Sequence, residues 1–226
     1  MNDLSSYAIA DFVPFTAEVY FRLIERVSET WWPLHLLTLT AGLAAAGLAW
    51  SGQTRSVGGL MAAALAWVSV TFLLTGYASL NWAGSWFGWA FLLASALLLL
   101  SVLTQPAPCQ MPARTLRRRD RVPRLAGLAL TALGVPLYPL IAPLAGRDWS
   151  QAEVFGIHPD PTAVATLGIA LLTLHGYRLW LTAIVPLLWC LVSALTLQVL
   201  QAPSPELLYA AIAVALLTCV KDTPLG

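Results

Sequence analysis

The stretch WAGSWFGWAFLLASALLLLSVLT (residues 82–104) contains no charged side chain. A hydrocarbon core about 30 Å thick requires roughly 20 apolar residues for one helical crossing. Backbone that faces lipid must satisfy its own hydrogen bonds, so a span is either an α-helix or a strand of a closed barrel. The apolar residues run continuously, without the alternation typical of barrel strands. This stretch is therefore predicted to be a transmembrane helix.

Similar stretches recur along the chain and predict a bundle of seven spans. The 226 residues are 58% hydrophobic and only 10% charged, whereas a soluble domain carries about 25% charged residues. The mean hydropathy is +0.74, and a water-soluble enzyme is excluded. We expect one all-α membrane domain (residues 1–226) with spans over residues 31–50, 57–79, 82–104, 125–145, 161–177, 179–200 and 206–220.

The connection over residues 105–124 predicts the orientation of these spans. It carries six arginines, Arg114, Arg117, Arg118, Arg119, Arg121 and Arg124, and basic connections are retained in the cytoplasm. With this loop inside, Arg55, Arg178 and Lys221 also fall inside, and the acidic N-terminal segment falls outside. The N-terminus is thus expected outside and the C-terminus inside.

Residues 12–30 are predicted to form an amphipathic helix that lies in the membrane interface. Their apolar side chains recur on one helical face, and charged side chains occupy most of the rest of the surface. This pattern is typical of a helix that rests in the headgroup region.

The most irregular apolar segment is GVPLYPLIAP (residues 134–143), whose prolines remove helical hydrogen bonds and predict a kinked or unwound helix. Discontinuous helices can hold a solute or ion at mid-membrane depth, although a kinked helix can also be purely structural. The segment VFGIHPDPTAVATLG (154–168) is too apolar for an exposed loop and is expected to pack back against the bundle, with Asp160 in the first turn of a helix at the outer surface. The predicted substrate-binding residues are Tyr77, Asn81, Pro136, Tyr138, Pro139, His158 and Asp160.

Other chemistries find little support in the sequence. A net charge of +1 provides no basic face for nucleic acid. Three cysteines without paired spacing are interpreted as free thiols. His35 and His158 leave an outer metal site conceivable, but no metal, cofactor or catalytic residue is predicted. The spans carry no acidic or basic side chain, which argues against a proton-coupled carrier.

The stretches LNWAGSWFGWAFLL (80–93), LYP (137–139) and FGIHPDPTAVATLG (155–168) resemble a bacterial integral membrane family known as domain-of-unknown-function family 6064. So does DFVPFTAEVYFRL (11–23), which precedes a first span headed by WWP. The family pattern often has a cysteine where this chain has Asp160, and a histidine near the end of the second span that is apolar here. The resemblance implies a bacterial inner (plasma) membrane protein, and it implies no established activity, cofactor or catalytic residue that could be carried over to this chain.

These observations predict a permease-like protein, not an enzyme, that binds or passes a small solute or ion beside the proline-rich span. The alternative is an accessory or scaffold subunit whose tryptophan-rich spans pack against a larger membrane complex. The expected partners are the lipid bilayer, the solute and, for the alternative, another membrane protein.

Overall fold

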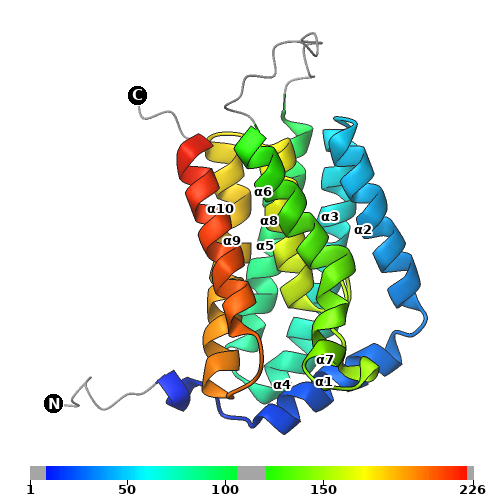
Figure 1. Cartoon of the computed structure of the whole chain (residues 1–226), viewed down its shortest axis with the longest axis vertical. Helices are drawn as coiled ribbons and strands as arrows, with labels where there is room; N and C mark the ends of the chain where they lie inside the picture. The colour runs from blue at the N-terminus through cyan, green and yellow to red at the C-terminus, as the bar shows by residue number, and fades with distance from the viewer. Residues whose placement is uncertain (1–8, 106–120, 223–226) are drawn as a thin grey trace, which may run out of the picture.

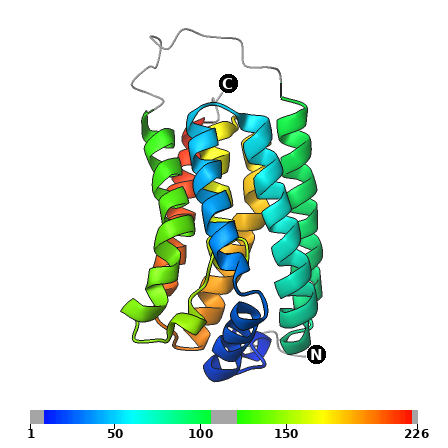
Figure 2. The ribbon, with the colours of Figure 1, turned by 90° about the vertical axis from the view of Figure 1, so that its right-hand side faces the viewer.

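The chain is all-helical, as predicted, and no strand occurs in the residues that the structure describes, 9–105 and 121–222. In this computed structural model the long helices stand side by side in a bundle (Figures 1 and 2). The α-helices are α1 (Ala17–Thr30), α2 (Leu34–Trp50), α3 (Thr54–Val68), α4 (Ala78–Leu80), α5 (Gly84–Leu103), α6 (Arg121–Ala132), α7 (Ile141–Leu144), α8 (Pro159–Thr173), α9 (Tyr177–Val199) and α10 (Pro205–Asp222).

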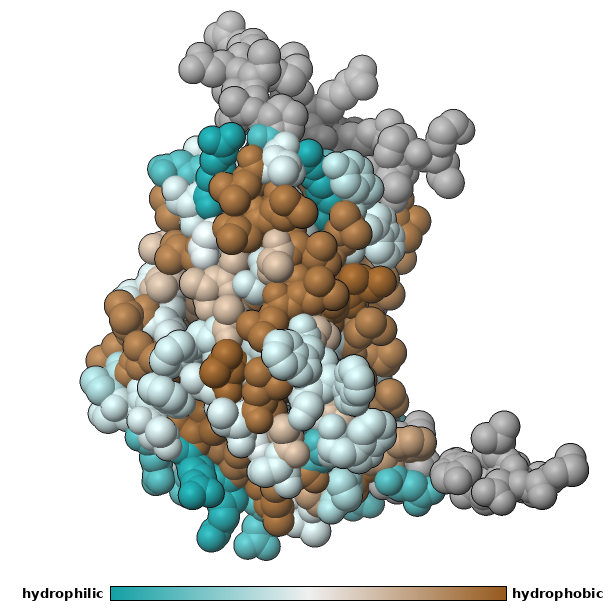
Figure 3. Space-filling view, turned by 180° about the vertical axis from the view of Figure 1, so that it is seen from behind, coloured by the Kyte–Doolittle hydropathy of each residue, from teal (hydrophilic) through white to brown (hydrophobic). Residues whose placement is uncertain are grey.

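Four helical segments are long and apolar enough to cross a membrane: Thr54–Leu80, Gly84–Leu103, Arg121–Leu144 and Tyr177–Val199. α1 and α2 together make a fifth candidate, bent by 91°. Hydrophobic residues dominate the flank of the bundle between more polar ends (Figure 3). The structure thus supports four or five spans by length and composition, fewer than the seven that the sequence predicts. Most of the predicted basic loop, residues 106–120, lies outside the described residues.

α1 lies across one end of the bundle, close to perpendicular to α2 (Figure 1). The helix predicted from residue 12 begins at Ala17, because Pro14 precedes it and the Thr16 hydroxyl caps its first turn by accepting from the amide of Val19 at 3.4 Å. A short 3₁₀ turn, η2 (Ile9–Phe12), occupies the preceding residues. Tyr20, Ile24 and Val27 form the buried face of α1.

The proline-rich helix is irregular, as its sequence predicts. α6 passes into the π-helical segment η6 (Leu133–Leu137), then into a 3₁₀ turn, η7 (Tyr138–Leu140), and ends as α7. A second π-helical segment, η3 (Ser69–Tyr77), joins α3 to α4. No sequence signal marked η3. The Ser69 hydroxyl there donates to the carbonyl of Gly88 in α5 at 2.6 Å.

α8 is the central helix of the bundle. Of its residues only Leu172 is not buried, and α8 contacts α2, α3, α6, α9 and α10. Close approach to α6 requires glycine: a Cβ on Gly168 would lie 2.5 Å from the Thr131 amide nitrogen and 2.7 Å from the Gly127 carbonyl oxygen. The two backbones are therefore in direct contact.

α8 is also short. Fifteen residues make a helix of about 22 Å, which is less than the 30 Å or so of a hydrocarbon core. The helix itself runs over Pro159–Thr173, where the sequence predicts a span over residues 161–177. The preceding segment, residues 152–158, is buried inside the bundle and continues the path of α8 toward the α1 end.

Candidate functional site

Residues 152–158 form a buried irregular segment, here called the buried turn, that leads into α8. Its backbone is satisfied locally, since the amides of Ile157 and His158 donate to the Val154 carbonyl at 3.1 and 2.9 Å. The Thr162 hydroxyl accepts from the Gly156 amide at 2.8 Å and donates to the His158 carbonyl at 2.7 Å. Irregular backbone is tolerated at membrane depth only when protein surrounds it in this way. The expectation that this apolar segment packs back against the bundle is confirmed.

Asp160 lies in the first turn of α8, directly after the buried turn, and is the centre of a polar cluster. Its Oδ1 accepts from the indole nitrogen of Trp189 at 2.7 Å, and its Oδ2 accepts from the Ser193 hydroxyl at 2.6 Å and from the Tyr138 hydroxyl at 3.4 Å. The carboxylate is fully buried. Three donors from two other elements, η7 and α9, thus converge on one acidic side chain.

The depth of Asp160 corrects the expectation that it faces the outer surface. Its partners Ser193 and Trp189 lie six and ten residues before the end of α9 at Val199, or about 9 and 15 Å along the helix axis. α8 begins inside the bundle because the buried turn occupies the outer part of its path. Asp160 is therefore an interior acidic residue, and the argument that the spans carry no such group is wrong.

His158 caps α8 and links it to α1. Its Nδ1 accepts from the Val154 amide at 3.0 Å, so in the neutral ring the proton is on Nε2, which faces the Ile24 carbonyl at 3.4 Å and the Ser28 hydroxyl at 3.5 Å. Burial lowers the pKa of His158 from 6.5 to about 3. Because its ring nitrogens are engaged by the protein, His158 has a structural role and is not a free ligand.

Glu153, also in the buried turn, is a second buried acidic residue. Only 7% of its surface is exposed, and its Oε2 makes no hydrogen bond with the described residues. Arg147 lines the same small cavity, with its Nε and Nη1 likewise unpartnered in that part of the chain and its guanidinium 4.2 Å from the ring centre of Phe21. Burial raises the pKa of Glu153 well above its usual 4.5, and the nearby Arg147 opposes this effect.

This raised pKa predicts a pH-dependent stability. The folded state holds the Glu153 proton at pH values where the unfolded chain has released it, so its contribution is complete below about pH 4.5 and decreases as the pH rises toward the folded pKa. We expect Glu153→Gln to make the melting temperature of the purified protein fall less steeply with pH above 4.5. An unchanged slope in this variant would show that Glu153 is ionised throughout.

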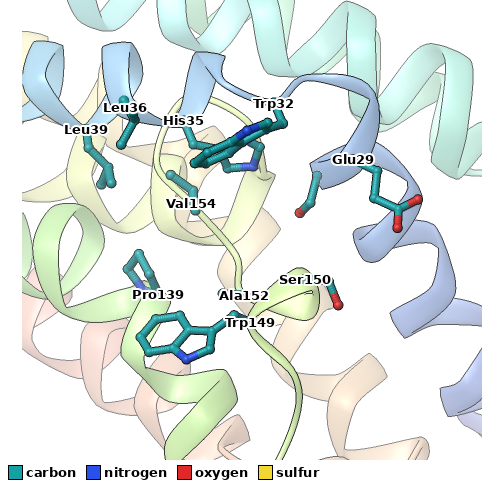
Figure 4. A pocket seen from close by; sticks show the side chains of 11 residues that line it. Glu29, Trp32, His35, Leu36, Leu39, Pro139, Trp149, Ser150, Ala152 and Val154 are labelled. Carbon is teal, nitrogen blue, oxygen red and sulfur yellow. The ribbon is translucent and has the colours of Figure 1, made fainter.

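A crevice of about 550 Å³ lies where the proline-rich helix meets the buried turn. Pro139 and Trp149 approach from one side, and Trp32, His35, Leu36 and Leu39 approach from α2 and the residues before it (Figure 4). Its lining is completed by Ser28, Glu29, Ser150, Ala152 and Val154. The crevice is mostly apolar, with a few polar groups at the α1 end.

Four of the residues predicted as substrate-binding belong to these two features. Tyr138, His158 and Asp160 meet in the interior, and Pro139 lines the crevice. Pro136, by contrast, is exposed and lies outside both features.

Tyr77 and Asn81 lie at a separate crevice of about 380 Å³, beside Phe12 and Thr196. Asn81 has a structural role there: its Nδ2 donates to the Phe12 carbonyl at 3.0 Å and its Oδ1 accepts from the Ala83 amide at 2.9 Å. Tyr77 packs edge-on against Trp189, with ring centroids 5.9 Å apart, and so borders the Asp160 cluster.

The polar residues of the interior that were not predicted include Glu153, Trp189 and Ser193. Trp189 and Ser193 are four residues apart, which places both on one face of α9, and this spacing was the available signal. From the sequence Glu153 is predicted to be an ordinary loop residue, because its position in the chain gives no information on its depth in the bundle.

No metal centre is found in the described part of the chain, where no three His, Cys, Asp or Glu side chains group closely enough to hold an ion. His35 and His158 do lie near each other, with ring centroids 6.4 Å apart. The Nδ1 of His158 already accepts from the Val154 amide. Cys190 and Cys219 are buried free thiols, and Cys109 lies outside the described residues.

The bundle, its apolar flanks and its buried acidic centre define the class: an all-helical protein with several helices long and apolar enough to span a membrane. The chain belongs to the family of unknown function DUF6064, whose family model matches residues 17–225. This match confirms the family that the sequence motifs resemble. Comparisons with curated proteins and with solved structures found no match. The function must therefore be argued from the site.

Proposed function

We propose that this chain is a small permease-like protein that binds a mostly apolar solute in the crevice beside the buried turn. The observation that carries this proposal is the coincidence of the crevice with the broken helix and the buried turn, at Pro139 and Val154. A volume of about 550 Å³ lies within the usual range for small-molecule sites. Broken helices are where transporters place their binding sites.

The lining of the crevice favours an amphipathic solute over a simple ion. Leu36, Leu39 and Pro139 suit an apolar body, and Ser28 and His35 suit one hydrogen-bonding group. His35 is buried, and its Nδ1 makes no hydrogen bond with the described residues. A buried polar atom without a partner is costly unless a ligand or water satisfies it.

We further propose seven crossings, with the N-terminus outside and the C-terminus inside a bacterial plasma membrane. In support, α1 and the end of α10 lie at opposite ends of the bundle (Figure 1), as an odd number of crossings requires. The element bounds place Arg55 at the start of α3, Arg121 and Arg124 at the start of α6, Arg178 at the start of α9 and Lys221 at the end of α10, and these helix ends lie at the end of the bundle distant from α1 (Figure 1). The α1 end holds the acidic residues Glu18, Glu25, Glu29, Asp148 and Glu206 together with the basic residues Arg22, Arg26 and Arg147. This distribution agrees with retention of basic ends in the cytoplasm.

The test is to fill the crevice. The fluorescent amine 1-aminoanthracene has a flat apolar body and one hydrogen-bonding group, and its emission rises in apolar sites. We expect Leu39→Trp to weaken its binding to the purified protein in lipid nanodiscs about tenfold, a loss of about 1.4 kcal/mol, because the larger ring occupies the crevice. Leu43→Trp is the matched control, since Leu43 is exposed on the same helix and does not line the crevice. Equal binding by both variants would contradict the proposal.

A second candidate, an accessory subunit of a larger complex, is favoured by one observation. Trp86 and Trp89 on α5, and Trp82 just before it, are all exposed, and the first two lie within one helical turn. In a larger complex a helix of the partner protein would pack over these rings, whereas in an isolated protein the rings would remain in contact with lipid. The polar interior around Asp160 is not needed for such a role and favours the permease-like candidate. Purification from native membranes, with leucine at all three positions, distinguishes them: loss of a co-purifying membrane protein supports the accessory role.

A further inference from the structure

Glu153 and Asp160 are the two buried acidic side chains of the described residues, and Tyr138 lies between them. The Tyr138 hydroxyl donates to Asp160 Oδ2 at 3.4 Å, and the same side chain lines a small cavity together with Glu153 and Arg147. The carboxyl groups are thus joined through one phenol and one cavity.

The cavity is the size of a single water molecule. Its volume is about 10 Å³, close to the minimum that holds one water, which also requires two to four polar partners. Glu153 Oε2 and the Nε and Nη1 of Arg147 are buried and make no hydrogen bond with the described residues. One water bridging these atoms satisfies all three.

The cavity borders the surface at the α1 end of the bundle. Pro203 and Ser204, from the connection between α9 and α10, complete its lining together with Arg147, and Pro203 is exposed. The cavity that Glu153 lines is therefore bordered by a residue exposed at the surface.

The surroundings of Asp160 favour uptake of a proton. The groups that face it are hydroxyls and a thiol that are neutral at pH 7, namely Tyr20 from α1, Tyr77 from η3, Tyr138 from η7, and Ser193 and Cys190 from α9. The neutral ring of His158 lies two residues away, and Arg147 is the cation on the far side of Glu153. An ionised carboxylate here has hydrogen bonds but no adjacent cation among residues 9–105 and 121–222, and buried charge without a paired cation is costly.

We infer that Asp160 is a reversible proton-binding site inside the bundle, loaded from the α1 end through Glu153, the bridging water and Tyr138. In the transfer step the phenol gives its proton to Asp160 Oδ2 and receives one on its oxygen from the water, which is reprotonated by Glu153. The net change is one proton moved from Glu153 to Asp160, and no group is oxidised or reduced. The hydroxyls of Ser193 and Tyr138 both donate and accept, so they can bind either form of Asp160.

This inference goes beyond the proposed function, because interior acidic residues are the usual proton carriers of coupled transporters. It does not depend on the crevice or on any solute. Its test uses the protein without a ligand, so its failure leaves the solute-binding proposal untouched.

The test is infrared spectroscopy of the full chain in lipid nanodiscs, grown with aspartate labelled with ¹³C at the side-chain carboxyl. The label shifts only aspartate bands, and among the described residues Asp160 is the one buried aspartate to which a band of a buried acid can belong. We expect a labelled band of a protonated, buried carboxylic acid that disappears reversibly as the pH rises. Its absence at every pH at which the protein is folded would overturn the inference.

The proton route is tested by a pH jump, after which the rate at which the labelled aspartate band changes is measured. We expect Glu153→Gln and Tyr138→Phe to slow the response about a hundredfold, the usual scale for loss of a proton-transfer group, and to leave the band itself in place. Asp148→Asn is the control, since Asp148 is exposed near the same end. If Glu153→Gln and Tyr138→Phe both respond at the wild-type rate, the path through Tyr138 is excluded. Asp160→Asn, where it folds, is expected to remove the labelled band.

Discussion

Replacement of Asp160 with leucine is expected to destabilise the folded protein by about 3–5 kcal/mol. The substitution leaves the Trp189 indole and the hydroxyls of Ser193 and Tyr138 without their acceptor, and each unsatisfied buried donor costs about 1–3 kcal/mol. The two hydroxyls can rotate toward other acceptors, so the expected total cost is less than three times the largest cost of one unsatisfied donor. The measurement is thermal unfolding of the detergent-purified protein, followed by size-exclusion chromatography.

Two further variants separate this effect from a general loss of charge. Asp160→Asn keeps the shape and one acceptor oxygen, and a much smaller loss of stability is expected. Asp148→Leu removes an acidic residue that is exposed and is expected to be close to neutral. If Asp160→Leu has the same melting temperature as the wild-type protein, the polar cluster contributes nothing to the stability of the fold.

Gly168→Val is expected to cost about 3 kcal/mol or more, the upper range for overpacking. The new side chain would collide with the Thr131 amide and the Gly127 carbonyl. These atoms belong to the α6 backbone and cannot rotate away, so α6 and α8 must separate. Because α8 carries Asp160, the polar cluster is expected to loosen as well, and the emission of Trp189 would change.

The matched control for this prediction is Gly47→Val in α2. A Cβ at position 47 meets no atom within 4 Å, so the same substitution adds no clash. We expect a melting temperature close to wild type for Gly47→Val and a clearly lower one for Gly168→Val. Equal values would mean that the contact between α6 and α8 tolerates a wider separation than the structure has.

The sequence predicts the helices because the physical signal for them is local. Runs without charge mark the long apolar helices, Thr16 marks the start of α1, and the prolines after Gly134 mark the irregular helix. These features depend on neighbours within a few residues. Where a helix begins could thus be predicted to within a few positions, with α1 the largest difference.

Depth in the bundle is a different quantity, and it explains what the sequence analysis missed. An Asp between two prolines indicates the first turn of a helix, but that pattern is the same at the surface and in the interior. Asp160 is interior because residues 152–158 occupy the outer part of the path of α8, a long-range packing result. Trp189 and Ser193 became partners of Asp160 for the same reason. Only the apolar character of Val154, Phe155 and Ile157 indicated this burial in advance.

The central claim, that the crevice between the proline-rich helix and the buried turn is a solute site, is tested most directly by photolabelling. A light-activated azide of anthracene would be bound to the purified protein in nanodiscs, cross-linked and mapped by peptide mass spectrometry. We predict adducts within residues 28–39 and 149–154, the two segments that contribute most of the crevice lining, and their loss in Leu39→Trp but not in Leu43→Trp. Adducts confined to the exposed tryptophans of α5, or unaffected by Leu39→Trp, would contradict the account.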